Sequence, residues 1–174
     1  MKKLLALCTA AALCLSLLAA CGSKTNQGDN PSTAPDRDVD LAAFAQTVQE
    51  NHEFAALEKA DPADQEMGAI MLENNYPGLK DMDLKQLEVY LAMISFSGGE
   101  LALAQAKSPE DAAKVKEIFQ ARIDTKSTDG PGNYPEEVEM WKKSAKVVES
   151  GDYVMLVNHP DSEAIAGEFE ALFK

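Results

Sequence analysis

Cysteine and histidine are scarce in this chain, and their scarcity excludes several kinds of chemistry. The three cysteines all precede residue 22: Cys8, Cys14 and Cys21. Residues 22–174 therefore hold no disulfide framework, no cysteine-ligated zinc and no cysteine nucleophile. His52 and His159 are the only histidines, too few for an ordinary zinc site without cysteine, so we expect no metal and no cofactor.

Basic residues are also few, with 16 Lys and Arg against 29 Asp and Glu and a formal net charge of −13. A negative surface opposes binding to phosphate backbones and to anionic lipid headgroups, so we expect no nucleic-acid partner. The sequence also lacks the Gly-x-Ser-x-Gly elbow of serine hydrolases and the Gly-x-x-x-x-Gly-Lys phosphate loop. Neither common hydrolase chemistry nor nucleotide binding is therefore indicated.

The first 21 residues have the pattern of a lipoprotein export signal. Lys2 and Lys3 precede an apolar run from Leu4 to Ala20, and small residues lead directly to Cys21. We expect residues 1–20 to be cleaved and a diacylglycerol on Cys21 to anchor the protein on the extracytoplasmic face of the cell membrane. The alternative is an uncleaved membrane helix, but the run is shorter than the ~20 residues that a span usually needs.

A flexible tether is expected over residues 21–38, behind the lipidated cysteine. Residues 22–38 contain two prolines and no aliphatic residue larger than alanine. The alternating acids of Asp36–Asp40 are typical of a calcium loop, but Leu41 and Thr47 stand where that loop needs glycine and glutamate. Residues 39–174 are long enough for one domain with a hydrophobic core.

Two helical segments are predicted at the start of this domain. Apolar residues recur at helical spacing from Asp40 to about Leu57, which predicts an amphipathic helix. A second helical segment begins at Pro62, has Met67, Ile70 and Met71 as its apolar stripe, and ends before Pro77-Gly78.

Two hairpins, each followed by a helix, are predicted in the rest of the domain. Strands 87–96 and 100–106 flank a glycine pair, and Ser108-Pro109 then opens a helix that ends near Thr125. A short helical stretch over 136–144 precedes the second hairpin. That hairpin turns at Ser150-Gly151-Asp152, and a helix capped near Asp161 follows it.

The two halves match at an offset of 53 or 54 residues, with Leu103 corresponding to Leu156 and Phe119 to Phe173. We interpret them as two ββα units. The predicted fold is α+β, with a four-stranded antiparallel sheet, two helices on one face and the N-terminal helices before them; the alternative is chance similarity between two hairpin–helix segments.

The predicted strands are apolar on both faces, so the second face also needs a cover. Val89, Leu91 and Met93 point to one side, and the alternating residues Tyr90, Ala92, Ile94 and Phe96 point to the other. The helix that begins at Asp40 is the expected cover. An apolar ligand or a partner subunit is the alternative.

Five short motifs resemble those of a family of lipoproteins from Gram-positive anaerobic bacteria, known only as a domain of unknown function. They are Tyr76-Pro77-Gly78, Gly99-Glu100-Leu101-Ala102, Pro109-Glu110-Asp111, Tyr134-Pro135-Glu136 and Gly151-Asp152-Tyr153-Val154-Met155. The resemblance spans Asp40 to Phe173. It implies the fold and the lipid anchor, but it implies no catalytic or binding residue.

Few residues are candidates for chemistry. His159 lies next to Asp161, so it is either a base oriented by a carboxylate or part of a helix-capping loop. His52 is expected on a solvated helix face. Trp141 with Met140 suits either a ligand groove or the core, and core packing is the commoner role.

The function predicted from these features is a non-enzymatic, membrane-anchored binding or scaffolding domain of the cell envelope. Its contact with the membrane would be the lipid on Cys21, and its partner an envelope protein or a small ligand. The alternative is an extracytoplasmic hydrolase whose general base is one of the histidines or an unpaired carboxylate. A solute-capture lipoprotein normally has two lobes and needs a longer chain.

Overall fold

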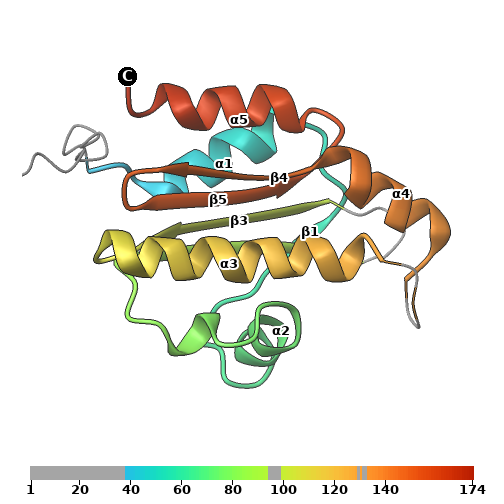
Figure 1. Cartoon of the computed structure of the whole chain (residues 1–174), viewed down its shortest axis with the longest axis horizontal. Coiled ribbons are helices and arrows are strands. Elements are labelled where there is room, and N and C mark those ends of the chain that lie inside the picture. The colour runs from blue at the N-terminus through green and yellow to red at the C-terminus, as the bar shows by residue number, and fades with distance from the viewer. Residues whose placement is uncertain (1–37, 94–98, 129, 131–132) are drawn as a thin grey trace, which may run out of the picture. The chain divides into compact units, whose positions relative to one another are not determined.

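A five-stranded antiparallel sheet in the order β1-β2-β3-β5-β4 is the centre of the fold. The computed structural model (Figure 1) describes residues 38–93, 99–128, 130 and 133–174, which belong to one compact unit spanning residues 32–174. The strands are β1 (Leu57–Lys59), β2 (Gln86–Ala92), β3 (Glu100–Gln105), β4 (Ala145–Ser150) and β5 (Tyr153–Asn158). The helices are α1 (Leu41–Asn51), α2 (Gly68–Asn75), α3 (Pro109–Lys126), α4 (Pro135–Ser144) and α5 (Ser162–Ala171), with a 3₁₀ turn at Leu79–Asp81. The α+β class is confirmed.

The fifth strand is a correction to the predicted four-stranded sheet. The helix expected to reach Leu57 ends at Asn51, because the backbone of His52 turns to an extended conformation. Leu57 then pairs with Ala92 at the edge of the sheet. Edge pairing with a distant strand is a tertiary interaction that overrides the local helical pattern.

Both predicted hairpins are present, and their inner strands pair with each other. Ala102 of β3 lies opposite Val89 of β2 on one side and opposite Leu156 of β5 on the other. The β4–β5 turn is the predicted one, with Gly151 at a φ of +59°. A left-handed residue in a two-residue hairpin loop favours glycine, which has no Cβ to clash. Most of the turn predicted at Ser97-Gly98-Gly99 lies outside the described residues.

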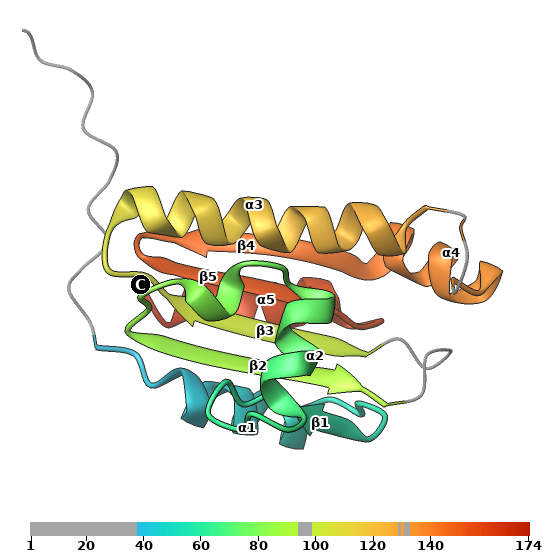
Figure 2. The same ribbon diagram turned by 90° about the horizontal axis from the view of Figure 1, so that it is seen from below.

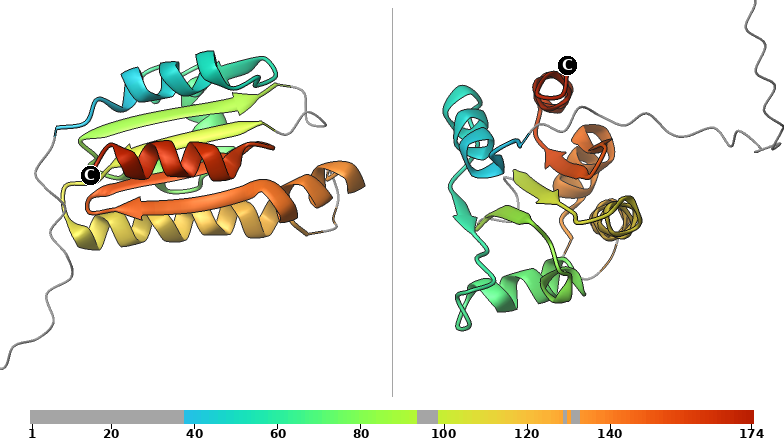
Figure 3. Two further views of the ribbon diagram at one scale, coloured as in Figure 1. Left: turned by 90° about the horizontal axis from the view of Figure 1, so that it is seen from above. Right: turned by 90° about the vertical axis from the view of Figure 1, so that its left-hand side faces the viewer.

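Helices cover both faces of the sheet, as the end-on view in Figure 3 shows. On one face α3 runs along the β4–β5 side while α2 crosses the β2 side (Figure 2). These helices pack on Val89, Leu91, Ala102, Ala104, Val154 and Leu156. On the other face α1 and α5 pack on Leu101, Leu103, Met155 and Val157.

The prediction that α3 and α5 share a face is therefore wrong. The inner strands β3 and β5 are apolar and buried on both sides, so each side needs a helix. The repeat interpretation also fails. A rotation that brings β4–β5 onto β2–β3 leaves α5 on the face opposite α3, so the two ββα units are not superimposable copies.

The prediction that the first helix, α1, covers the second face of the sheet is confirmed. Leu41, Phe44 and Val48 are buried in the cluster against which Tyr90 packs. Phe119 and Phe173 are both buried, as predicted, although they lie on opposite faces of the sheet.

The apolar stripe predicted for the second helix is confirmed at Met71, which packs against the core, and is wrong at its other two positions. Met67 and Ile70 are 53% and 55% exposed, whereas Leu72 is buried. The helix also begins at Gly68 rather than near Pro62, because the Asp64 carboxylate accepts from the backbone N–H groups of residues 66 and 67 and holds a turn there. Throughout the described residues, each helix is too short or too polar to cross a lipid bilayer.

Candidate functional site

A cavity of about 220 Å³ lies where α2, α3 and α4 meet the ends of β2 and β3. Its charged or hydrogen-bonding lining residues include Glu100, Arg122, Lys126, Glu137 and Trp141. Concave sites with a few converging polar groups are the usual places for small ligands. We therefore consider this cavity, called here the α4 cavity, as the candidate functional site.

Arg122 and Glu100 form a bidentate ion pair in the wall of the α4 cavity. Arg122 Nε and Nη2 donate to the two carboxylate oxygens over 2.9 and 2.8 Å. The Tyr76 hydroxyl donates to the same carboxylate. Glu100 is the first residue of β3 and is only 3% exposed, so a guanidinium fork and a hydroxyl replace the water that this charge would need.

The electrostatics of this group favour the charged form of Arg122 and the neutral form of Tyr76. Burial lowers the pKa of Arg122, but the charge and hydrogen bonds of Glu100, together with smaller contributions from Tyr76 and Glu137, outweigh it and the net pKa is raised. Burial, followed by the charge of Glu100, raises the pKa of the Tyr76 hydroxyl well above 10.0. Tyr76 is therefore a permanent hydrogen-bond donor to Glu100 at neutral pH.

Two aromatic rings hold the guanidinium in place. Arg122 Cζ lies 5.7 Å from the Tyr76 ring centre and 5.4 Å from the Trp141 ring centre. Both distances are within the range of cation–π attraction. Arg122 thus links α2, β3 and α4 from its position on α3, and its orientation is fixed before any ligand arrives.

A second ion pair joins α3 to α4. Lys126 Nζ lies 2.6 Å from Glu137 Oε1, and Glu137 is 3% exposed. The other oxygen, Glu137 Oε2, has no hydrogen-bond partner, and neither has Trp141 Nε1. Trp141 is 1% exposed and lies four residues after Glu137 on the same face of α4. Each of these two atoms exposes less than 1 Å², although their residues line the cavity. Buried polar atoms are nearly always hydrogen-bonded, so these two are exceptions.

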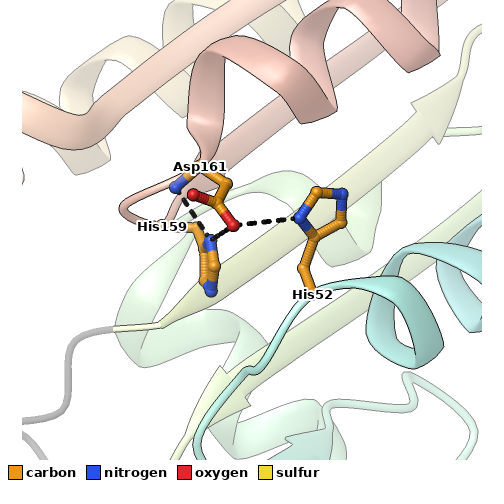
Figure 4. Close-up of side chains that lie close together, drawn as sticks. All are labelled: His52, His159 and Asp161. Atoms are coloured by element: carbon orange, nitrogen blue, oxygen red, sulfur yellow. Dashed lines mark hydrogen bonds and ion pairs between the residues drawn. The ribbon is translucent and has the colours of Figure 1, made fainter.

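A separate polar cluster lies on the opposite face of the sheet, between α1 and α5. His52 is placed with Nδ1 3.2 Å from Asp161 Oδ2 (Figure 4) and Nε2 3.2 Å from Glu168 Oε1. Burial lowers the pKa of His52, but the two carboxylate hydrogen bonds outweigh it, and the net pKa is raised above 6.5. The solvated position predicted for His52 is wrong, since its side chain is 10% exposed.

His159 belongs to this cluster but is engaged by the backbone. Its Nδ1 accepts from the Asp161 backbone N–H over 3.0 Å, and its Nε2 lies 3.3 Å from the Glu53 carbonyl oxygen. The ring also packs on Phe54, 4.4 Å between centres. The lone pair of Nδ1 is thus engaged by a backbone N–H at the start of α5, which favours the capping alternative over the general base.

Within the described residues, His52, His159 and Asp161 are close enough to hold a metal ion. A metal at this point would compete with the Asp161 N–H for His159 Nδ1 and with the hydrogen bond between His52 and Asp161. We therefore interpret the cluster as a clamp, called here the His52 clamp, which joins the end of α1 to the start of α5.

The sequence pointed to only part of these sites. Trp141 was expected either in the core or in a groove, and it is both fully buried and part of the α4 cavity wall. Glu100, Arg122 and Glu137 were not singled out. The one available signal was Glu100, an acid at the start of the apolar run Leu101–Ala104. Cys21, the predicted lipidation site, lies outside the described residues.

The fold and the cavity define an α+β domain with helices on both faces of one sheet and a charged cavity on one of them. The chain belongs to DUF4358, a domain of unknown function, whose family model matches residues 58–159, more than half of the chain. The resemblance to a family of unknown function is thereby confirmed. No curated protein and no solved structure matches the chain.

Proposed function

We propose that this protein is a membrane-anchored extracytoplasmic lipoprotein whose domain binds a small ligand in the α4 cavity without transforming it. The observation that carries the binding proposal is the α4 cavity itself, a hollow of about 220 Å³ with two carboxylates and two cations among its lining residues. Small ligands usually bind in concave sites where a few polar groups converge.

The proposed anchor rests on the sequence pattern that ends at Cys21. Loss of residues 1–20 removes Lys2 and Lys3 and shifts the formal charge of −13 by two units, to −15. Such a charge does not favour an anionic lipid surface, so the lipid on Cys21 would supply the membrane contact. Metabolic labelling with a fatty acid tests this: Cys21→Ala should abolish incorporation, and label at the wild-type level would refute the anchor.

The cavity favours binding because its charges are held in fixed pairs. Both oxygens of Glu100 accept hydrogen bonds from Arg122. Oε1 of Glu137 is paired with Lys126. Preorganised donors and acceptors around a small volume are what a selective binding site needs.

The binding proposal can be tested with a pool of small metabolites. The lipidated wild-type protein and Trp141→Phe, which keeps an aromatic ring but loses the N–H, would be incubated with the pool and analysed by native mass spectrometry. We expect a retained ligand with the wild type and its loss with Trp141→Phe. Equal retention by both, or none by either, would contradict the proposal.

An extracytoplasmic hydrolase is the second candidate, and one observation favours it. Glu137 is a carboxylate among the lining residues of the α4 cavity, and one of its oxygens has no hydrogen-bond partner, so Glu137 is the candidate general base. Turnover of an ester or peptide substrate that is abolished in Glu137→Gln would establish this alternative. Its absence while a ligand is retained unchanged supports the binding function.

A further inference from the structure

We infer that the outer side of α1 and α5 is a docking surface for a basic amphipathic helix of another protein. The two helices lie on the same face of the sheet (Figure 3), where the rings of Phe44 and Phe169 are 5.8 Å apart between centres. Beside this contact lies a groove of about 830 Å³, called here the α1–α5 groove. It shares no lining residue with the α4 cavity, so the inference does not depend on the ligand proposed for that cavity.

The α1–α5 groove follows one side of α1 over the whole length of the helix. Its lining residues Asp40, Ala43, Thr47 and Asn51 recur every three or four positions, which places them along one stripe. From residue 40 to residue 51, at 1.5 Å per residue, this stripe is about 16 Å long, or about three helical turns. A helical segment of about three turns on the partner therefore matches the groove in length.

Small side chains along the groove leave room for the backbone of a docked helix. Ala43 and Thr47 on α1 and Ala171 on α5 are exposed, whereas Phe44 beneath them is buried. The exposed lining of the groove is mainly apolar. Amphipathic helices dock in such grooves through apolar residues spaced three or four positions apart. The partner helix therefore needs an apolar stripe on one side.

Carboxylates at both ends of the groove determine the charge that the partner helix should carry. Asp38 and Asp40 are exposed at the end where α1 begins. Glu168 lies at the end where α1 stops, 3.2 Å from His52, with its side chain 41% exposed. The described lining of the groove includes no lysine or arginine. A helix with lysine or arginine at both ends of its apolar stripe complements this pattern.

The same charges argue against other occupants of the groove. A second copy of the chain would place three carboxylates against the same three carboxylates, and an anionic lipid surface would place phosphates there. Like charges brought together in this way are unfavourable. The formal net charge of −13 adds to both repulsions. The groove therefore favours a cationic segment of a different protein.

Fluorescence anisotropy of a labelled synthetic peptide tests the inference with the lipidated protein in detergent. The peptide is a helix of about 15 residues with alanine and leucine along one stripe and lysines at both ends. One comparison peptide has the same composition in shuffled order, and another has glutamate in place of lysine. We expect the first peptide to bind about tenfold or more tightly than either, and to bind more weakly at high salt.

Groove variants and a matched control connect peptide binding to the α1–α5 groove. Ala171→Arg places a bulky cation in the groove, whereas Ala121→Arg makes the same change at an exposed position of α3, on the other face of the sheet. We expect the first to weaken binding by about tenfold or more and the second to leave it within about twofold. Any uptake of the peptide by the micelle is common to both. Thermal unfolding checks the fold, and Thr47→Arg repeats the test from α1 if Ala171→Arg is unfolded.

A photo-cross-linking residue in place of Ala171 identifies the natural occupant in intact membranes. An adduct with another protein supports the inference if the linked segment has lysine or arginine at both ends of an apolar helical stripe. An adduct between two copies of the chain, with lipid or within one chain overturns it, as does the absence of any adduct. Equal binding of the three peptides, or equal binding by Ala171→Arg and Ala121→Arg, also overturns it.

Discussion

Arg122→Met tests whether the buried ion pair organises the α4 cavity. The methionine keeps most of the apolar stem of Arg122 but removes the guanidinium. Glu100 would then be left nearly fully buried with only the Tyr76 hydroxyl as a partner. The contacts of the guanidinium with the rings of Tyr76 and Trp141 would also be lost.

The expected loss of stability is large because both partners are shielded from water. The side chains of Arg122 and Glu100 are 12% and 5% exposed. Removing one partner of such a pair typically costs about 3–5 kcal/mol, most of it from the charge left behind. For a domain of this size about 3 °C of melting temperature corresponds to 1 kcal/mol, so the midpoint should fall by roughly 10–15 °C.

A second substitution separates the cost of the unpaired Glu100 charge from the other effects of losing Arg122. In Arg122→Met/Glu100→Gln the carboxylate is replaced by a neutral amide that still accepts from Tyr76. We expect the double variant to be more stable than the single variant by about 2 kcal/mol, because no buried charge remains. Urea unfolding followed by circular dichroism measures both. A single variant within about 1 kcal/mol of the wild type, or a double variant no more stable than the single, would refute the reasoning.

Three further predictions concern the rest of the domain. The raised pKa of His52 means that its protonated ring stabilises the fold below pH 6.5 and that this contribution is lost as the pH rises through the folded-state value. His52→Gln should therefore cost about 0.2–1 kcal/mol at pH 5.5 and little at pH 8.5; an equal loss at both values would exclude the charged clamp. Gly151→Val should cost about 1–3 kcal/mol because of the φ of +59°, whereas Gly151→Asn should cost less because asparagine tolerates that conformation; equal denaturation midpoints would contradict the strained turn. Phe119→Ala should cost about 3–5 kcal/mol, and Phe173→Ala less because Phe173 lies beyond the end of α5; equal losses would argue against this difference in packing.

Local signals predicted those parts of the fold that neighbouring residues determine. Ser108 caps α3 by accepting from the Asp111 backbone N–H, and Pro109 opens the helix. Gly151 turns the second hairpin. Each of these depends on residues within three positions in the chain, so the sequence around them is sufficient to predict them.

Features that depend on distant segments could not be predicted in this way. The strand at Leu57 exists because it pairs with β2, more than thirty residues away. The sequence of α5 also does not determine which face of the sheet this helix covers. β3 and β5 are apolar on both sides, so a helix could pack on either face. Periodicity identifies the apolar side of a helix but not the face of the sheet that it covers.

The charged residues of the cavity were missed for a related reason. Arg122 follows an exposed alanine near the end of α3, and Glu137 lies in the first turn of α4, where an acid ordinarily interacts with the helix dipole. Such positions look like surface in a single sequence. They become buried only because α3 and α4 converge on the end of β3, where Glu100 begins the strand.

Of the two polar clusters, only the α4 cavity lies wholly within the residues that match the family model. The region that defines DUF4358, residues 58–159, contains every residue that lines the α4 cavity, from Met71 to Trp141. It excludes α1 and α5, and with them His52 and Glu168. A site that serves the activity of a family must be built from the segment that its members share, whereas a clamp between flanking helices need not be. This difference supports assigning ligand binding to the cavity and a stabilising role to the His52 clamp.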